Sequence, residues 1–183
     1  MADADVDRDR LARIARGDRS AFEDLYRAYQ PRIFGYLYRT LGSAENAEEV
    51  ATDVMVEVWK QAGTFRGDSK VSTWIFGIAR FKALTGLRRV RTDTVEVEAA
   101  GPLIDPGERP DEVLERDSMK SRIRRALAQL SEDHREVMEL TFFQGFTYPE
   151  IAAVVDCPVN TVKTRMFHAR KQLRELLGAG GIP

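Results

Sequence analysis

The chain has 183 residues, enough for one ordinary domain or two small ones, and its 28 Lys and Arg residues nearly balance its 29 Asp and Glu residues. This balance excludes a global basic field, so any nucleic-acid binding must depend on local charge. A single cysteine, Cys157, excludes an intramolecular disulfide framework, and the two histidines, His134 and His168, are too few for a typical metal site. We therefore expect neither a metal nor a cofactor.

The hydropathy of the chain is that of a globular protein without membrane insertion. The first residues, MADADVDRDRLARIARGDR, are charged throughout and contain no apolar stretch, which argues against a signal peptide. No run approaches about 18 apolar residues, the length that a membrane-spanning helix needs. The sequence therefore predicts a soluble, cytoplasmic protein.

Helical spacing dominates the N-terminal half. Apolar residues between positions 20 and 41 follow steps of three and four, and Pro31 is expected to kink or divide this segment. Residues 44–59 carry one apolar stripe, and residues 72–91 are apolar around much of the predicted helix. Together these segments predict an all-helical N-terminal unit.

Residues 92–119 differ sharply from what precedes them. They contain three of the seven prolines and nine acids against two bases, a net charge of −7. Proline and like charge both oppose compact folding, so we expect an extended acidic linker, with helix resuming near Asp111. The alternative is a plain spacer. The predicted organisation is an N-terminal domain at 1–91, a linker at 92–112 and a C-terminal domain at 113–183.

The C-terminal part predicts further helices joined by short turns, at residues 121–130, 131–143, 146–155 and 157–174. Thr147 and Glu150 have the spacing of a capping box at the start of the third segment. A capped helix, a short turn and a basic helix are the pattern of a helix-turn-helix. The fold class predicted for the whole chain is thus all-α, with two small helical domains.

The last predicted helix has a buried face and a basic face. Its buried face is formed by Val162, Met166, Ala169, Leu173 and Leu176. Because a recognition helix presents its N-terminal residues to base edges, we expect contacts to bases and nearby phosphates from Asn160, Thr161, Lys163, Thr164 and Arg165. Contacts to the DNA backbone are expected further along, from His168, Arg170, Lys171 and Arg174. The alternative is a solvated basic face, and Cys157 is expected to be a small packed residue.

The helix at residues 44–59 carries five acids and no base, namely Glu45, Glu48, Glu49, Asp53 and Glu57. Like charges four residues apart weaken an isolated helix, so a basic partner surface is expected to offset them. A solvated face is one alternative. Paired catalytic carboxylates are a weaker one, because no histidine, metal cluster or glycine-rich phosphate loop accompanies the acids.

The helix at residues 72–91 reverses the sign of the charge. It holds Arg80, Lys82, Arg88, Arg89 and Arg91 without an acid, interleaved with the aromatic residues Trp74, Phe76 and Phe81. Positive charge beside aromatic rings is how proteins hold single-stranded nucleic acid and unstacked bases. For Trp74, a place in the core is an equally open alternative.

These segments, in this order, resemble the extracytoplasmic-function (group IV) sigma factors of RNA polymerase, compact factors that retain only regions two and four. AENAEEVATDVMVEVW is similar to region 2.2 of the family, and FRGDSKVSTWIFGIARFKALTGLRR is similar to regions 2.3 and 2.4. The stretch from LSEDHREVMELTFF to the end of the basic helix is similar to region four. The resemblance covers nearly all of residues 20–177.

The resemblance implies a function for each surface. Region 2.2 would bind the coiled coil of the largest polymerase subunit. Region four would read the −35 element and sit on the flap of the second-largest subunit, and an anti-sigma factor would be a further partner. Regions 2.3 and 2.4 would melt the −10 element and capture a flipped base in the loop at residues 64–70. The implied −10 contacts are Arg66, Ser69, Lys70, Trp74, Arg80, Phe81, Lys82, Arg88 and Arg89.

Three positions depart from the habit of the family. Phe81 stands where Asn is common, Thr85 where Asp or Asn is usual, and Asn160 where Gly or Ser often precedes the Thr-Val-Lys. The first two bear on the −10 preference, whereas Asn160 either adds a base contact or caps the helix. The function predicted is a non-enzymatic sigma factor. The alternatives are a freestanding helix-turn-helix regulator and, with no catalytic constellation to support it, a hydrolase or transferase.

Overall fold

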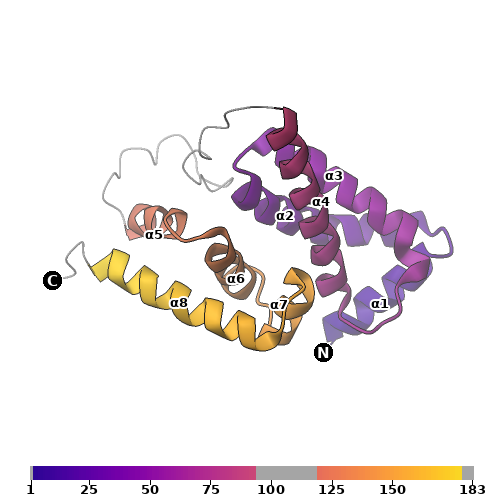
Figure 1. Cartoon of the computed structure of the whole chain (residues 1–183). Coiled ribbons are helices and arrows are strands. Elements are labelled where there is room, and N and C mark those ends of the chain that lie inside the picture. Colours follow the sequence, from indigo (N-terminus) through magenta and orange to yellow (C-terminus); the bar gives the residue numbers. More distant parts are fainter. Residues whose placement is uncertain (1, 94–118, 179–183) are drawn as a thin grey trace. The chain divides into compact units, whose positions relative to one another are not determined.

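The computed structural model describes residues 2–93 and 119–178, with side chains described for residues 5–86 and 122–178. Every regular element in these ranges is a helix, which confirms the all-α class (Figure 1). The chain divides into two compact units, called here the N-terminal unit (α1 to α4) and the C-terminal unit (α5 to α8). Among the helices described, none is long and apolar enough to cross a membrane.

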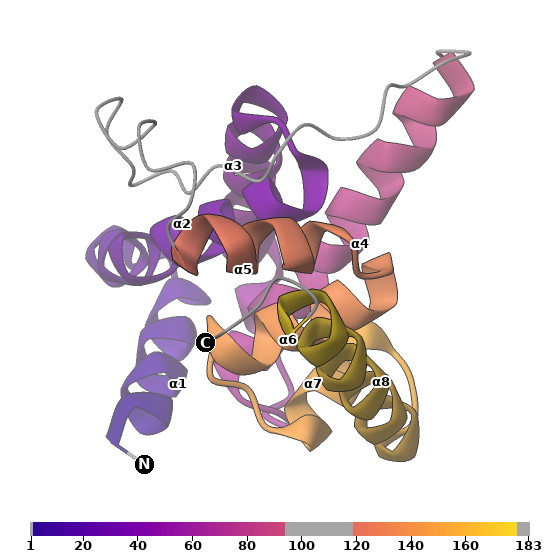
Figure 2. The same ribbon diagram turned by 90° about the vertical axis from the view of Figure 1, so that its left-hand side faces the viewer.

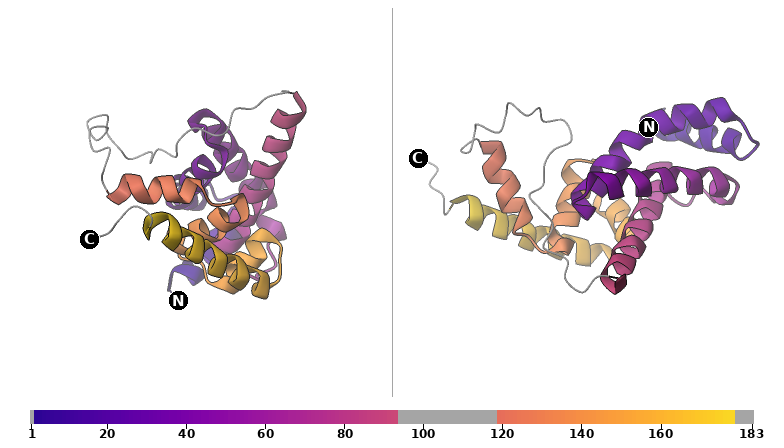
Figure 3. Two further views of the ribbon diagram at one scale, coloured as in Figure 1. Left: turned by 60° about the vertical axis from the view of Figure 1, so that its left-hand side comes forward. Right: turned by 90° about the horizontal axis from the view of Figure 1, so that it is seen from above.

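The N-terminal unit is built around a helical hairpin. Helix α2 (Arg19–Leu41) packs against α3 (Ala44–Gln61), and α4 (Val71–Asp93) packs against both (Figures 1 and 3). The hairpin turn is short because Gly42 ends α2 in the left-handed conformation, with φ of 71°, and Ser43 caps α3 through its hydroxyl. The fully buried side chains of this unit include Leu25, Ile33, Tyr36, Leu37, Val54, Met55, Val58, Ile75 and Phe76.

Proline at position 31 does not divide α2, which runs unbroken from Arg19 to Leu41. A proline removes one backbone hydrogen bond, but Pro31 lies on the exposed side of the helix, where water can satisfy the freed carbonyl. Tyr29 and Ile33 are buried on either side of it and hold both halves of the helix on the core. The prediction of a possible break at Pro31 was therefore wrong.

A further helix, α1 (Ala2–Ile14), precedes the segments predicted from the sequence. It packs on α2 and α4 through Leu11 and Ile14, whose side chains are 1% and 2% exposed. The hydroxyl of buried Tyr29 donates to Asp7 Oδ2 over 2.5 Å. Few of its residues are apolar, so its periodicity is weak in the sequence.

The C-terminal unit consists of α5 (Met119–Ala128), α6 (Glu132–Phe142), α7 (Tyr148–Val155) and α8 (Val159–Gly178), with α8 packed against α5 and α6 (Figure 2). The predicted capping box is confirmed, since the backbone N–H of Thr147 donates to Glu150 Oε2 over 2.7 Å. Asp156 ends α7 in the left-handed conformation, with φ of 51°, and the chain turns directly into α8. The helix-turn-helix predicted from the sequence is therefore formed by α7 and α8.

Residues 94–118 lie outside the described part of the chain. They contain most of the predicted acidic linker, while Thr92 and Asp93 are the last residues of α4. The linker and the domain boundaries at 91 and 112 therefore remain predictions.

Candidate nucleic-acid interface

The acids of α3 share its solvent face. The exposed acids are Glu45, Glu48, Glu49 and Asp53. The helix starts at Ser43 and Ala44, and its valine stripe faces the core. Val56 lies on the same outer face, seven residues after Glu49, and is 44% exposed. Sequence reasoning missed Val56 because a valine beside a valine stripe is easily assigned to the core. The face thus has an apolar residue among its acids, which suits a protein partner better than a solvated surface.

Glu57, the last of these acids, is half-buried and tied to α4. Its carboxylate lies 3.4 Å from Lys82 Nζ and accepts a hydrogen bond from Gln61 Nε2 over 2.5 Å. The bond from Gln61, followed by the Lys82 ammonium, holds the pKa of Glu57 below its ordinary value. The structure therefore brings together two residues that the sequence had placed in different sites, one facing polymerase and one facing DNA.

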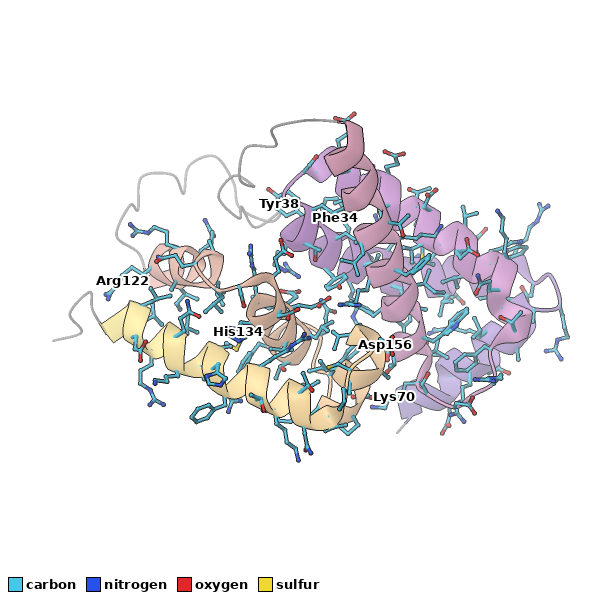
Figure 4. All side chains as sticks on the ribbon, in the orientation of Figure 1. Phe34, Tyr38, Lys70, Arg122, His134 and Asp156 are labelled. Atoms are coloured by element: carbon cyan, nitrogen blue, oxygen red, sulfur yellow. The ribbon has the colours of Figure 1, made fainter. Side chains whose placement is uncertain are left out.

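The capture loop predicted at residues 64–70 begins with Thr64, the last residue of η1 (Ala62–Thr64), and continues as the turn at residues 65–70 that leads into α4. Arg66 is 85% exposed in its side chain and pairs with Asp68 over 3.1 Å, while Gly67 between them has φ of 80°. The ring of Phe65 lies 5.4 Å from that of Trp74, which anchors the turn on the first turn of α4. Lys70, labelled in Figure 4, is exposed directly before α4.

Trp74 is only half-buried, so it serves both as a packing residue and as part of the surface.

Helix α4 displays an aromatic ring where the family commonly has an amide. Phe81 is 71% exposed, and the Thr85 hydroxyl donates to the Phe81 carbonyl oxygen over 2.8 Å. Arg80 and Lys82 flank Phe81 and are half-buried. Arg88 and Arg89 belong to α4, but their side chains lie outside the described residues. This surface can stack on a base, whereas Phe81 offers no side-chain hydrogen bond to read its edge.

The predicted buried face of α8 is confirmed at Val162, Met166 and Ala169, which are at most 1% exposed, while Leu173 and Leu176 are half-buried. Of the predicted DNA contacts, Thr161 and Arg165 are half-buried, and the exposed ones are Asn160, Lys163, Thr164, His168, Arg170 and Lys171. Asn160 lies inside the first turn of α8, which begins at Val159, and its carbonyl oxygen accepts a hydrogen bond from the Thr164 hydroxyl over 3.0 Å. Asn160 is thus an exposed residue of the first turn of α8 rather than its cap.

Arg165 is not a freely moving cation. Its Nη2 lies 2.6 Å from Asp133 Oδ2 in the first turn of α6, and its side chain is 23% exposed. Asp133 was not singled out in the sequence, because 32 positions separate the two residues and no local pattern links them. The carboxylate restricts the direction of the guanidinium, and a bidentate contact to a guanine requires a defined direction.

The two histidines of the chain, His134 of α6 (labelled in Figure 4) and His168 of α8, lie close together. Their ring centroids are 6.2 Å apart with an interplanar angle of 21°, and the residue before His168, Phe167, contacts it edge-on with ring centroids 5.4 Å apart. Phe167 is 65% exposed on the same outer face as Lys163 and Lys171. An exposed phenylalanine on a basic helix is a signal that sequence reasoning could have used, since it suits contact with thymine methyl groups.

Arg170, in the second half of α8, also has a neighbour on α6. The Arg170 guanidinium lies over the Phe142 ring, 5.9 Å from its centroid, which steadies this side chain against α6. Among the described residues, no three His, Cys, Asp or Glu side chains converge as a possible metal site. What the arrangement can do is bind charged polymers and a protein partner.

Two known sequence families match the chain. Residues 25–92 match Sigma-70 region 2, and residues 120–173 match Sigma-70, region 4. These segments coincide with α2 to α4 and with α5 to α8, so each match falls on one compact unit.

Characterised relatives extend the similarity over almost the whole chain. The RNA polymerase sigma-H factor of Pseudomonas aeruginosa is 33% identical, over 97% of this chain and 96% of its own length. The ECF RNA polymerase sigma factor RpoE of Cereibacter sphaeroides is 36% identical, over 86% of this chain and 87% of its own.

Solved structures agree with the sequence comparison. CnrH, in complex with the cytosolic domain of CnrY, superimposes with a TM-score of 0.70 at 25% identity, over 96% of this chain and 99% of that one. RpoE of Bartonella quintana, in complex with the anti-sigma factor NepR, gives a TM-score of 0.70 at 26% identity, over 86% of this chain and 96% of that one. The chain belongs to the extracytoplasmic-function sigma factors of the sigma-70 family, non-enzymatic subunits that direct promoter-specific initiation of transcription.

Proposed function

We propose that this sigma factor uses three separate surfaces, one for core polymerase and one for each promoter element. The observation that carries the proposal is the opposite charge of neighbouring helices in the N-terminal unit. The outer face of α3 is acidic with Val56 among the acids, whereas α4 is basic and aromatic, and the Glu57–Lys82 pair lies where the two helices meet. A protein surface and a nucleic-acid surface side by side suit a subunit that holds DNA against an enzyme.

The acidic face of α3 binds core polymerase, at the coiled coil of its largest subunit. Glu45, Glu48, Glu49 and Asp53 are free to face a basic partner, whereas Glu57 keeps Lys82 as its partner and contributes less. Charge complementarity of this kind mainly sets the rate and specificity of association. The flap of the second-largest subunit is the second polymerase contact, made by the C-terminal unit.

The turn at residues 65–70 and the outer face of α4 bind the −10 element as single strand. Trp74 and Phe81 supply rings for unstacked bases, each stack being worth about 1–3 kcal/mol by alanine substitution. Hydrogen-bond donors and positive charge come from Arg66, Ser69, Lys70, Arg80, Lys82, Arg88 and Arg89. Because Phe81 replaces an amide, its base contact depends on ring stacking rather than on hydrogen bonds.

Helix α8 enters the major groove at the −35 element. The end of the helix that reaches bases carries four exposed residues, Asn160, Lys163, Thr164 and Phe167. Two half-buried residues, Thr161 and Arg165, lie beside these four. His168, Arg170 and Lys171 lie further along and meet phosphates. Asn160 adds a base contact that the usual Gly or Ser could not make.

An acidic linker at residues 92–112 separates a region-two domain at 1–91 from a region-four domain at 113–183, and threads toward the path by which the transcript leaves. A dedicated anti-sigma factor is a further partner, as NepR is for RpoE of Bartonella quintana. The chain falls in group IV of the family, and its place of action is the cytoplasm, with the polymerase.

The experiment that tests the proposal is charge reversal on α3. The double variant Glu49→Lys/Asp53→Lys is expected to keep its helical circular dichroism but to lose binding to core polymerase and run-off transcription, because two repulsive contacts replace two attractive ones. The matched control, Asp5→Lys/Asp9→Lys, makes the same change of charge at exposed positions of α1 and is expected to bind core normally. Retained core binding by the α3 variant would refute the proposed polymerase surface.

A further inference from the structure

Helix α1 reaches the proposed capture turn through one side chain. Arg8 Nη2 donates a hydrogen bond to the carbonyl oxygen of Gly67 over 2.9 Å, between residues 59 positions apart in the sequence. Gly67 is the central residue of the turn and has φ of 80°, a conformation that L side chains rarely adopt. The bond therefore joins the middle of the turn to helix α1.

The turn has little else to hold its middle in place among the contacts described. Its first residue, Phe65, is anchored against Trp74, and the Ser69 hydroxyl donates to the carbonyl of the next residue over 3.2 Å. The Arg66–Asp68 pair is 85% and 74% exposed, and such exposed pairs restrain a chain weakly. Among the contacts described for the turn, the bond from Arg8 is the one that reaches its middle from another element of the fold.

Helix α1 is itself held by contacts within the N-terminal unit, so the backbone that carries Arg8 has a fixed position. The residue before Arg8, Asp7, accepts the Tyr29 hydroxyl and pairs with Arg10 over 3.1 Å. Leu11, one turn further along, is buried in the core. A side chain mounted on such a helix can hold a turn in one conformation, whereas a side chain on a free N-terminal segment could not.

We propose that Arg8 is a positioning residue for −10 recognition: its bond to the Gly67 carbonyl holds the turn in the shape that receives the unstacked base. This rests on the proposed function of the turn. A turn that is already ordered loses less conformational entropy when DNA binds, so affinity rises without any new contact to DNA. Arg8 acts on the turn and not on a phosphate.

The test uses holoenzyme assembled from core polymerase and the full chain, with fork-junction DNA whose −10 element is single-stranded. Arg8→Ala is expected to weaken binding to this DNA about three- to tenfold, as expected for the loss of an exposed charge-assisted hydrogen bond. Affinity for core polymerase and for a −35 duplex should stay unchanged. Arg16→Ala, which removes the same charge from an exposed arginine just after α1, is the control and should match the unaltered chain.

Salt dependence separates positioning from direct contact. A phosphate contact by Arg8 would lower the slope of log affinity against log salt by about one when the residue is removed. Positioning predicts an unchanged slope. Gly67→Ala strains the turn without altering charge, and it should cause a similar loss that is not increased by adding Arg8→Ala.

The outcomes distinguish this inference from the function on which it rests. If the unaltered holoenzyme shows no −10-dependent binding, the proposed function of the turn fails. If it does show such binding but Arg8→Ala binds as tightly, or loses one unit of salt slope, only the role of Arg8 is overturned. Should Arg8→Ala prove unstable, the Gly67→Ala comparison alone decides, since an unchanged affinity there also overturns it.

Discussion

Two cations of α8 are oriented by partners on the neighbouring helix α6. Arg165, the most restrained of the predicted base contacts, is held by Asp133 at 2.6 Å, and Arg170 lies over Phe142. The carboxylate has two opposing effects on DNA binding, since it directs the guanidinium but also cancels part of its charge. The two effects differ in what they change: direction sets sequence preference, whereas charge sets affinity for any sequence.

This difference leads to a prediction for Asp133. Arg165→Ala is expected to weaken binding to the −35 duplex by about 1–3 kcal/mol if the guanidinium reads a base. Asp133→Asn is expected to raise affinity for a scrambled duplex and to lower the ratio of specific to non-specific affinity. Titration of both duplexes at one salt concentration, by fluorescence anisotropy, measures that ratio.

The control for this prediction is Asp156→Asn, which makes the same charge change in the turn before α8. Asn tolerates the left-handed conformation of Asp156, so the fold of the turn is kept. The ratio should be unchanged in this variant. An unchanged ratio in Asp133→Asn as well would show that the ion pair is structural and has no part in reading.

At the scale of elements, the junction of α1 and α2 depends on one carboxylate. Asp18 caps α2, accepting from the backbone N–H groups of Ser20 and Ala21, and it also pairs with Arg13 over 2.8 Å at the end of α1. The Ala21 bond, followed by that of Arg13, lowers the pKa of Asp18 below its ordinary value of 3.8. Asp18 therefore links α1, a helix that the sequence did not predict, to the hairpin of α2 and α3.

The lowered pKa gives this junction a pH dependence. Because the folded value lies below the unfolded one, the contribution of Asp18 to the free energy of unfolding is present above pH 3.8 and is lost as the pH falls through the folded pKa. Asp18→Asn keeps a good cap but loses the ion pair and the titration. It should be less stable at pH 7 and lose less stability on acidification.

Urea unfolding of both chains at neutral and acidic pH measures the effect. Glu48→Gln, which changes an exposed carboxylate of α3, is the control and should leave the free energy of unfolding at neutral pH unchanged. If the free energy of unfolding falls with pH to the same extent in the unaltered chain and in Asp18→Asn, the proposed pH dependence of the junction is wrong.

For the whole molecule, the balance of charge matters more than any single patch. The net charge of −1 means that the acids of α3 and of residues 92–119 oppose the DNA-binding charge of α4 and α8. The free chain is therefore expected to bind promoter DNA weakly. Under the proposed function, polymerase covers these acids and holds both units, so that the two proposed DNA surfaces act on one molecule of DNA.

Joint action of the two units predicts a spacing rule. Holoenzyme should bind a promoter with both elements about 10²–10⁴ times more tightly than one with a single element, since the second contact becomes intramolecular. Inserting about five base pairs between the elements, half a helical turn, should remove most of this gain. Inserting about a full helical turn of DNA restores the relative rotation of the two elements but keeps them further apart, so comparing the two insertions separates the effect of rotation from that of distance. An affinity indifferent to spacing would show that the elements are read independently.

Local physics explains how much of this protein could be predicted from its sequence. The periodicity of α2, α3 and α8 and the Thr147–Glu150 box each involve residues a few positions apart, which a linear pattern records directly. The acidic face of α3 could be predicted in the same way, because a helix brings residues four apart to one side. The fold class and the candidate surfaces followed from these patterns.

The tertiary structure alone decided which side chains are paired. The contacts of Tyr29 with Asp7, Glu57 with Lys82 and Arg165 with Asp133 join residues far apart in the sequence, and helix packing brings them together. The same holds for α1, whose stability as a helix comes from a buried face that few apolar residues announce. The sequence by itself determined helices α2 to α8 and the sign of charge on α3, α4 and α8. Packing determined which charges remain available to a partner, because a charge already paired within the fold is no longer free to bind.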